Sequence, residues 1–182
     1  MNATVRLTDP NSAAAPTFAQ PFEMLEACHE RVHRSLDLLA RLRAHVATQG
    51  ADEQARQAAH DVLRYFDVAA PHHHLDEELH VFPLLLARGT PATVAVVERL
   101  QVEHRQMEIR WQTARIVLEA LAAGHRSALD APADAALDAF VELYADHVRA
   151  EEDIVYPEGE ALLDAQALAA MGDEMRRRRG AA

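Results

Sequence analysis

Eleven histidines stand out in this chain of 182 residues, and four of them have spacings that could bring their imidazoles together as ligands of metal ions. These four are His29, His73, His104 and His147. The midpoint of the first pair is next to Gly50, that of the middle pair is at Gly89, and that of the last pair is next to Gly124. Glycine commonly ends a helix, so each midpoint marks a predicted turn between antiparallel helices. Because residues equidistant from such a turn lie at the same height, we expect all four imidazoles in one layer.

Two glutamates complete the predicted layer, because each follows one of these histidines by four residues. The pairs His73–Glu77 and His147–Glu151 each place an imidazole and a carboxylate on one helix face, about 5–6 Å apart at Cβ. An unpaired carboxylate is costly in an apolar core, and a pair of cations removes that cost because each carboxylate can bridge two ions. Four imidazoles, two bridging carboxylates and a bridging oxygen leave one open position on each of two six-coordinate ions. Small molecules react at such open positions.

Nitrogen and oxygen donors without a thiolate suit Fe, Mn or Zn by ligand softness, and the spacing does not choose among these metals. Ferritin-like di-iron bundles use Glu-x-x-His motifs, in which the carboxylate comes first and the step is three residues. Here the histidine comes first and the step is four residues, as in His73-x-x-x-Glu77. The order and spacing of the motif in this chain therefore differ from those of the ferritin-like di-iron proteins, and the sequence fits that class less well.

Apolar residues at three- and four-residue steps predict the helices that must position this layer. Each of four apolar stripes carries one of the four histidines on its buried face. The stripes cover residues 22–46, 63–87, 97–121 and 137–154, and a shorter Ala- and Leu-rich segment covers 161–175. Short connections between the stripes favour an all-α, up-down-up-down four-helix bundle with a short additional C-terminal helix.

The chain divides into three predicted parts. Residues 1–20 are rich in Ala, Asn, Thr, Ser and Pro without periodicity, and we expect a loosely ordered leader there. The bundle is expected over 21–160, followed by the C-terminal helix and a basic tail over 161–182. The run from Arg176 to Arg179 is favourable at a helix C-terminus and is otherwise expected to be solvated, with a specific anionic partner as the alternative.

An internal repeat selects His73 from the run of three consecutive histidines at 72–74. The second and fourth stripes match at seven positions: Leu63, Phe66, His73, Glu77, Glu78, Phe82 and Pro83 match Leu137, Phe140, His147, Glu151, Glu152, Tyr156 and Pro157. Only His73 keeps the register of His147 relative to the glutamates and prolines that follow. His72 and His74 lie about 100° of helix rotation to either side. We expect them to be exposed or to contact the ligands rather than to bind metal.

Composition and charge narrow the function classes. Lys and Arg total 18 against 29 Asp and Glu, which gives a formal net charge of −11 and argues against a nucleic-acid-binding protein. The single cysteine, Cys28, cannot form an internal disulfide, and we expect a buried structural thiol. Because no apolar run approaches the length of a membrane span and the N-terminus lacks a signal pattern, we expect a cytoplasmic protein without membrane contact.

The residues around the two His–Glu pairs resemble the haemerythrin-like, or HHE cation-binding, family. The resemblance covers about residues 22–160. Its most specific elements are two motifs, His73-x-x-x-Glu77-Glu78-x-x-x-Phe82-Pro83 and His147-x-x-x-Glu151-Glu152-x-x-x-Tyr156-Pro157. Single histidines on the first and third stripes, His29 and His104, complete the pattern.

The resemblance implies a non-haem di-iron centre in a four-helix bundle. It implies that the four histidines are terminal ligands and that Glu77 and Glu151 are bridging carboxylates. It also implies two iron ions (Fe2+/Fe3+) held with a bridging oxygen species, and Mn or Zn fit the same donor set. The implied partner is a small diatomic or peroxide ligand. Oxygen or nitric-oxide chemistry, iron sensing and stress protection are among the roles of the family.

The sequence departs from two branches of this family. Oxygen-carrying haemerythrins have five histidines, and the fifth follows the third-helix ligand by four residues, where this chain has Glu108. Four histidines give a two-plus-two site, so the resemblance does not extend to reversible oxygen carriage. Glu108 is a candidate seventh ligand, although it lies beside the apolar stripe of His104. The iron-centre repair branch carries an N-terminal segment with a cysteine, which residues 1–20 lack.

Several further side chains have both a functional and a structural interpretation. Trp111 is expected to fill the core, with a lid over the open metal positions as the alternative. Tyr144 either donates a hydrogen bond to a metal-bound oxygen species or simply packs. His80 is too far along its stripe to join the layer, but could contact its ligands. Pro71 is expected to kink the second helix or to mark its restart.

Three function hypotheses of different classes follow. The leading one is a non-haem di-iron protein that binds or reacts with oxygen, peroxide or nitric oxide for sensing, storage or stress protection. The alternative is an iron-sensing or regulatory binding module whose fold is ordered by metal. A metal-free structural bundle ranks last, because it leaves the inward polar groups without an evident partner. No nucleophile–base arrangement or phosphate-binding glycine loop appears, so any turnover would belong to the metals. The sequence does not indicate an oligomeric state.

Overall fold

Capping side chains and glycines define where the helices begin and end. The carboxylates of Asp52, Asp130 and Asp164 each accept a hydrogen bond of 2.8–3.0 Å from the backbone N–H three residues on. Such caps satisfy N–H groups that a helix N-terminus leaves without a partner. Gly50 follows the first helix, α1 (Pro21–Gln49), with a φ of 80°. A side chain would be strained at this φ, so glycine allows the chain to turn there.

The computed structural model describes residues 17–180, which are helical apart from short connections and contain no strand. This confirms the prediction of an all-α chain. Residues 1–16, most of the predicted leader, and residues 181–182 lie outside the described residues. None of the described helices is long and apolar enough to cross a membrane.

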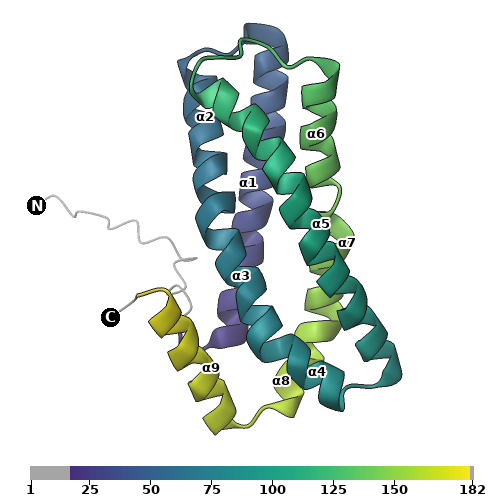
Figure 1. Cartoon of the computed structure of the whole chain (residues 1–182). Helices are drawn as coiled ribbons and strands as arrows, with labels where there is room; N and C mark the ends of the chain where they lie inside the picture. Colours follow the sequence, from purple (N-terminus) through teal and green to yellow (C-terminus); the bar gives the residue numbers. More distant parts are fainter. Residues whose placement is uncertain (1–16, 181–182) are drawn as a thin grey trace, which may run out of the picture.

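Four helical rods lie side by side (Figure 1). The first is α1, and the third is the long helix α5 (Pro91–Ala122). The second rod consists of α2 (Glu53–Arg64), η1 (Tyr65–Ala69), α3 (Ala70–Asp76), η2 (Glu77–Val81) and α4 (Phe82–Arg88). The fourth rod consists of α6 (Ala131–Val141), α7 (Tyr144–Ala150), η3 (Glu151–Val155) and α8 (Tyr156–Leu162). A final helix, α9 (Ala165–Arg178), packs against α1.

The second and fourth rods are interrupted by three π-helical turns, and the first of these directly precedes the segment with Pro71, where the sequence predicts a kink or a restart of the helix. The turns η1, η2 and η3 are each followed by a residue whose N–H donates to the carbonyl five positions back: Ala70 to Tyr65, Phe82 to Glu77, and Tyr156 to Glu151. A proline follows each donor directly, namely Pro71, Pro83 and Pro157. Because proline lacks the N–H that an α-helix would use next, the widened turn accommodates it. Two of these turns begin at the predicted bridging glutamates.

Two apolar clusters form the core, one on each side of the histidine layer. One contains Val32 and Met107, which lie one turn beyond His29 and His104 on their helices. The other contains Leu25 and Leu100, which lie one turn before the same two histidines. The polar layer is therefore enclosed along the rod axes by apolar side chains that exclude water.

The basic run at the end of α9 is held by an acid on the second rod. Asp76 is fully buried and forms ion pairs with Arg178 at 2.8 Å and with Arg179 at 2.5 Å. The expectation of a solvated run is therefore wrong for these two arginines. The carboxylate of Asp76, which is buried beneath them, explains the difference. Arg176 instead forms a surface pair with Asp173 at 2.8 Å, where both side chains are exposed.

Candidate metal centre

The structure brings the four predicted histidines together as two pairs within one layer. The ring centroids of His29 and His73 are 4.7 Å apart, and those of His104 and His147 are 4.9 Å apart. The Nε2 atoms of His29 and His73 are 3.0 Å apart. All four side chains are buried. Each comes from a different rod, so the layer crosses the whole interior.

Glu151 lies between the two histidine pairs and presents one carboxylate oxygen to each. Its Oε1 is 2.9 Å from Nε2 of His147 and 3.6 Å from Nε2 of His104. Its Oε2 is 3.2 Å from Nε2 of His29. The carboxylate is completely buried.

Glu77 also presents one carboxylate oxygen to each histidine pair. Its Oε1 is 3.5 Å from Nε2 of His73, and its Oε2 is 3.4 Å from Nε2 of His104. It is also completely buried. Each histidine pair is therefore accompanied by one oxygen from each of the two glutamates, which is the arrangement that bridging carboxylates need.

Several potential ligand atoms of this layer lack hydrogen-bond partners among residues 17–180. These atoms include Nε2 of His104, Nε2 of His147, Oε2 of Glu77 and both oxygens of Glu151. A buried polar group without a partner costs about 1–3 kcal/mol, and native proteins avoid such groups unless an ion or water satisfies them. One oxygen or nitrogen from each of His29, His73, Glu77 and Glu151 lies within 4.8 Å of the others. The residues present therefore fit a metal centre.

Burial and mutual charge perturb the acid–base properties of the layer. Burial and the neighbouring charge of Glu151 raise the pKa of Glu77 well above its ordinary value. Burial opposes ionisation of Glu151 too, but the imidazoles beside it outweigh burial and lower its pKa well below the ordinary value. For His104, Glu151 and Glu78 outweigh burial and raise the pKa to about 10. The metal-free layer thus retains protons that a bound cation would displace.

Three further carboxylates orient the imidazoles from outside the layer. The Nδ1–H groups of His29, His104 and His147 donate to Glu152 at 2.9 Å, Glu78 at 3.1 Å and Glu103 at 2.9 Å, respectively. Such bonds fix the ring orientation and raise the basicity of a metal-binding histidine. Sequence reasoning did not assign these roles, although the repeated doublets Glu77-Glu78 and Glu151-Glu152 carried a signal for two of them.

Tyr156 is a fourth residue whose role the sequence did not reveal. Its hydroxyl donates a hydrogen bond of 2.5 Å to Oε1 of Glu77, and its ring is stacked on that of His29 at 5.4 Å. Tyr144, the tyrosine considered as a hydrogen-bond donor, packs its ring against Phe66 and Phe140.

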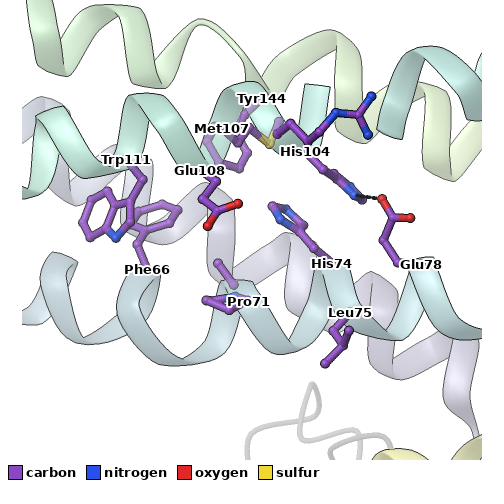
Figure 2. A pocket seen from close by; sticks show the side chains of 12 residues that line it. Phe66, Pro71, His74, Leu75, Glu78, His104, Met107, Glu108, Trp111 and Tyr144 are labelled. Atoms are coloured by element: carbon purple, nitrogen blue, oxygen red, sulfur yellow. Dashed lines mark hydrogen bonds and ion pairs between the residues drawn. The ribbon is translucent and has the colours of Figure 1, made fainter. Parts of the chain in front are cut away.

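A cavity of about 360 Å³ reaches the layer from the side, between the second rod and α5 (Figure 2). Its wall includes His74 and His104 at one end and Phe66 and Trp111 at the other. Apolar and polar side chains share the lining, and the charged ones include Glu78, Arg105 and Glu108. The cavity is large enough for a small molecule to approach the histidines.

Three further residues considered from the sequence, Glu108, Trp111 and His80, lie in different environments. Glu108 is exposed and lines the cavity, outside both groups of potential ligands. Trp111 packs against Phe66 and donates from Nε1 to Asp67 at 2.9 Å, which favours its structural interpretation. His80 pairs with Glu174 on α9 at 2.7 Å and does not contact the ligands.

Two further buried or partly buried residues, Cys28 and His74, lie next to predicted ligands in the sequence. Cys28 is a buried free thiol, as expected. His74 forms a group with His104 and His147 in which one ligand atom from each lies within 4.8 Å of the others. The sequence predicts that His74 is exposed or contacts the ligands, and its ring is stacked on that of His104 at 4.1 Å, in agreement with the second alternative.

Comparison with known proteins gives two findings. The family described as hemerythrin HHE cation binding domain matches residues 20–177, which extend from the start of α1 into α9. An uncharacterized protein of Haemophilus influenzae is 32% identical over 163 residues, which cover 90% of this chain and 92% of that protein.

Proposed function

This chain belongs to the hemerythrin HHE cation binding domain family, and from that premise we propose that it is a non-haem di-iron protein. In this proposal the protein binds or reacts with oxygen, peroxide or nitric oxide, for sensing, storage or stress protection. The observation that carries the proposal is the division of the carboxylate oxygens of Glu77 and Glu151 between two histidine pairs. Two ions side by side would use every one of these donors.

The proposed ligands are the six residues predicted from the sequence. His29 and His73 serve one ion, His104 and His147 serve the other, and Glu77 and Glu151 serve both. Nitrogen and oxygen donors suit iron, and they also suit Mn or Zn. When bound, a pair of iron ions supplies redox chemistry and coordination positions for a small molecule.

The chain itself prepares this site in three ways. Glu78, Glu103 and Glu152 hold three imidazoles in orientation through their Nδ1–H groups. Tyr156 holds Glu77 through its hydroxyl. The apolar clusters on both sides exclude bulk water, while the lateral cavity admits a small molecule.

We assign the metal-binding unit to residues 21–160, as an up-down-up-down four-helix bundle. Residues 161–182 are then an added helix and basic tail, which the buried Asp76 holds through Arg178 and Arg179. The loosely ordered leader over 1–20 stays a prediction.

A second candidate, an iron-sensing module, is favoured by the unpartnered donor atoms of the layer. If these unpartnered atoms destabilise the metal-free core, metal binding raises the stability of the fold. A large metal-dependent rise in melting temperature without any reaction toward oxygen, peroxide or nitric oxide would favour this role.

Reconstitution with ferrous iron tests the leading proposal. The metal-free chain is loaded under nitrogen, and its visible spectrum is recorded before and after addition of air, azide or nitric oxide. We expect new absorption bands that depend on the added molecule. A loaded protein that stays spectrally silent in all three conditions would contradict the proposal.

A further inference from the structure

We propose that the outer face of α5 binds the same face of a second copy of this chain, with the two helices antiparallel. The surface is an apolar stripe of four residues at seven-residue intervals: Val102, Ile109, Ile116 and Ala123. None of these residues is a proposed metal ligand, so the surface is separate from the metal centre.

The stripe is exposed although it is apolar. The exposed fractions of Val102, Ile109 and Ile116 are 48%, 56% and 67%, and Ala123 at the end of the helix is exposed as well. The opposite face of α5 packs into the core through residues such as Met107. In Figure 1, α5 runs along the front of the bundle. The stripe is therefore the face that α5 presents to another molecule.

The seven-residue interval is the spacing with which one helix packs along another. Single apolar side chains on a surface are common, but an exposed helix face is normally polar, and these side chains lie on one line. β-branched residues also have a slightly lower helix propensity, so Val102, Ile109 and Ile116 do not serve the helix by itself. Residues 102–123 form a seam about 32 Å long. Its length and period fit a partner helix.

A two-fold axis perpendicular to α5 matches the stripe with itself. When Ile109 faces Ile116 of the partner subunit, Val102 faces Ala123 of the partner subunit, because positions equidistant from the axis share a height. Each contact occurs twice, as in any symmetric dimer. All four apolar positions of each copy are then covered.

The residues at the centre of this arrangement are neutral. Gln112 and Thr113 are exposed beside the stripe, and each lies within one residue rise, about 1.5 Å, of the height of its own counterpart. The amide of Gln112 both donates and accepts hydrogen bonds, so two copies can pair across the axis. The centre therefore adds no repulsion, although the chain as a whole has a formal net charge of −11.

Charges farther from the axis are complementary. Arg105 lines the cavity between the second rod and α5, and Glu119 pairs with Arg115, which reaches Asp67 on the second rod. Arg105 and Glu119 thus lie on the same side of the stripe. The two-fold axis brings this side of both copies together, with Arg105 within about 1.5 Å of the height of Glu119 of the partner subunit. Each dimer gains two such pairs.

The two neighbouring registers bring like charges together instead. If Ile109 faces Ile109 of the partner subunit, Glu119 lies close to Glu98 of the partner subunit, because Glu98 precedes Arg105 by seven residues and lies on the same side. If Ile109 faces Val102 of the partner subunit, Arg105 lies beside Arg105 of the partner subunit. Like charges at short range repel each other. The register in which Ile109 faces Ile116 of the partner subunit is therefore preferred.

Sedimentation equilibrium of the full chain over a concentration series tests the stripe. We expect wild type to dimerise with a dissociation constant in the micromolar range, because a single helix pair is a small interface. Ile109→Lys should stay monomeric where wild type is dimeric. The control Val68→Lys replaces a valine that is 57% exposed on the second rod, and it should dimerise like wild type. A wild type that is monomeric at millimolar concentration, or an Ile109→Lys chain that dimerises equally well, would overturn the proposal.

Charge reversal tests the antiparallel register. Arg105→Glu leaves two glutamates at the paired positions, and Glu119→Arg leaves two arginines. Each variant alone should dimerise at least about fivefold more weakly than wild type, because each dimer has two such contacts and one surface pair changes an equilibrium by about two- to fivefold. In an equal mixture both contacts between unlike copies are attractive, so we expect the mixture to recover the association of wild type. A mixture that associates no better than the separate variants would overturn the register.

Disulfide trapping locates the two-fold axis. We expect Thr113→Cys to form a covalent dimer under mild oxidation, because this position lies beside its own counterpart. Gln106→Cys, on the same side of the stripe, is the control, since its counterpart is about 20 Å away along the helices. A disulfide requires Cα atoms no more than about 7 Å apart. Equal trapping of the two variants, or trapping of neither, would overturn the antiparallel pairing.

Discussion

The hydroxyl of Tyr156 lies 2.5 Å from Oε1 of Glu77 and donates a hydrogen bond to it. This contact joins the fourth rod to the second across the interior. It also distinguishes the two halves of the repeat, because Phe82 occupies the matching position near His104. The buried carboxylate of Glu77 therefore has a hydrogen-bond donor, the hydroxyl of Tyr156, whose ring is stacked on that of His29.

Replacing Tyr156 by phenylalanine removes this donor without removing the ring. Oε1 of Glu77 then stays buried without its partner. We expect the free energy of unfolding of the metal-free chain to fall by about 1–3 kcal/mol, the cost of an unsatisfied buried group. Urea unfolding measures the change. Tyr144→Phe, which keeps the ring packed against Phe66 and Phe140, is the control. An equal or larger loss in the control would contradict this role of Tyr156.

Glu152 orients His29 from outside the metal layer, so its loss should weaken metal binding. We expect Glu152→Ala to lower iron affinity by about 10–100-fold, as is usual when the hydrogen-bond partner of a metal-binding histidine is lost. Asp153→Asn, at the adjacent exposed position, removes the same charge and serves as the control. Competition with a chelator measures both affinities. Identical affinities for the two variants would show that Glu152 acts only through its charge or not at all.

Asp76 anchors the end of α9, and its removal should destabilise the fold. Asp76→Asn leaves Arg178 and Arg179 without their buried anion. Breaking a buried pair typically costs about 3–5 kcal/mol. The matched control is Asp173→Asn, which breaks a surface pair with Arg176 and should cost at most about 1 kcal/mol. Urea unfolding distinguishes the two, and similar losses would contradict the anchoring role.

The pH dependence of the metal-free chain should report the contact between Glu174 and its basic neighbours. Hydrogen bonding to Arg178, followed by that to His80, lowers the pKa of Glu174 from 4.5 to about 2. A folded-state pKa below the unfolded value means that the stabilisation is present above about pH 4.5 and is lost as pH falls toward about 2. We expect wild type to be more stable than Glu174→Gln at pH 7 and the difference to shrink by pH 3. A difference independent of pH, measured by thermal unfolding, would contradict this assignment.

The positions of the polar residues along the axes of the helical rods were predictable from the sequence, because they follow from helix geometry. His29, His73, His104 and His147 lie at matched distances from glycine-marked turns, and the structure places them in one layer. Glu77 and Glu151 follow by the same helical spacing. Their role as ligands stays a prediction, but their proximity follows from periodicity.

Contacts between rods were not predictable in the same way. The pairing of Asp76 with Arg178 and Arg179 depends on where α9 packs, which no local pattern encodes. The hydroxyl of Tyr156 reaches Glu77 through a backbone that carries π turns, which alter the helical register assumed from the sequence.

Iron stoichiometry in matched chains tests the central claim that Glu77 and Glu151 hold two ions between the histidine pairs. Wild type and the double variant Glu77→Gln, Glu151→Gln are loaded with excess ferrous iron under nitrogen, desalted and analysed for iron per chain. The variant keeps the shape of both side chains but removes the two charges, and far-UV circular dichroism checks its fold. We expect two irons per wild-type chain and fewer than one per variant chain. A wild type that retains less than one iron, or a variant that retains two, would contradict the account.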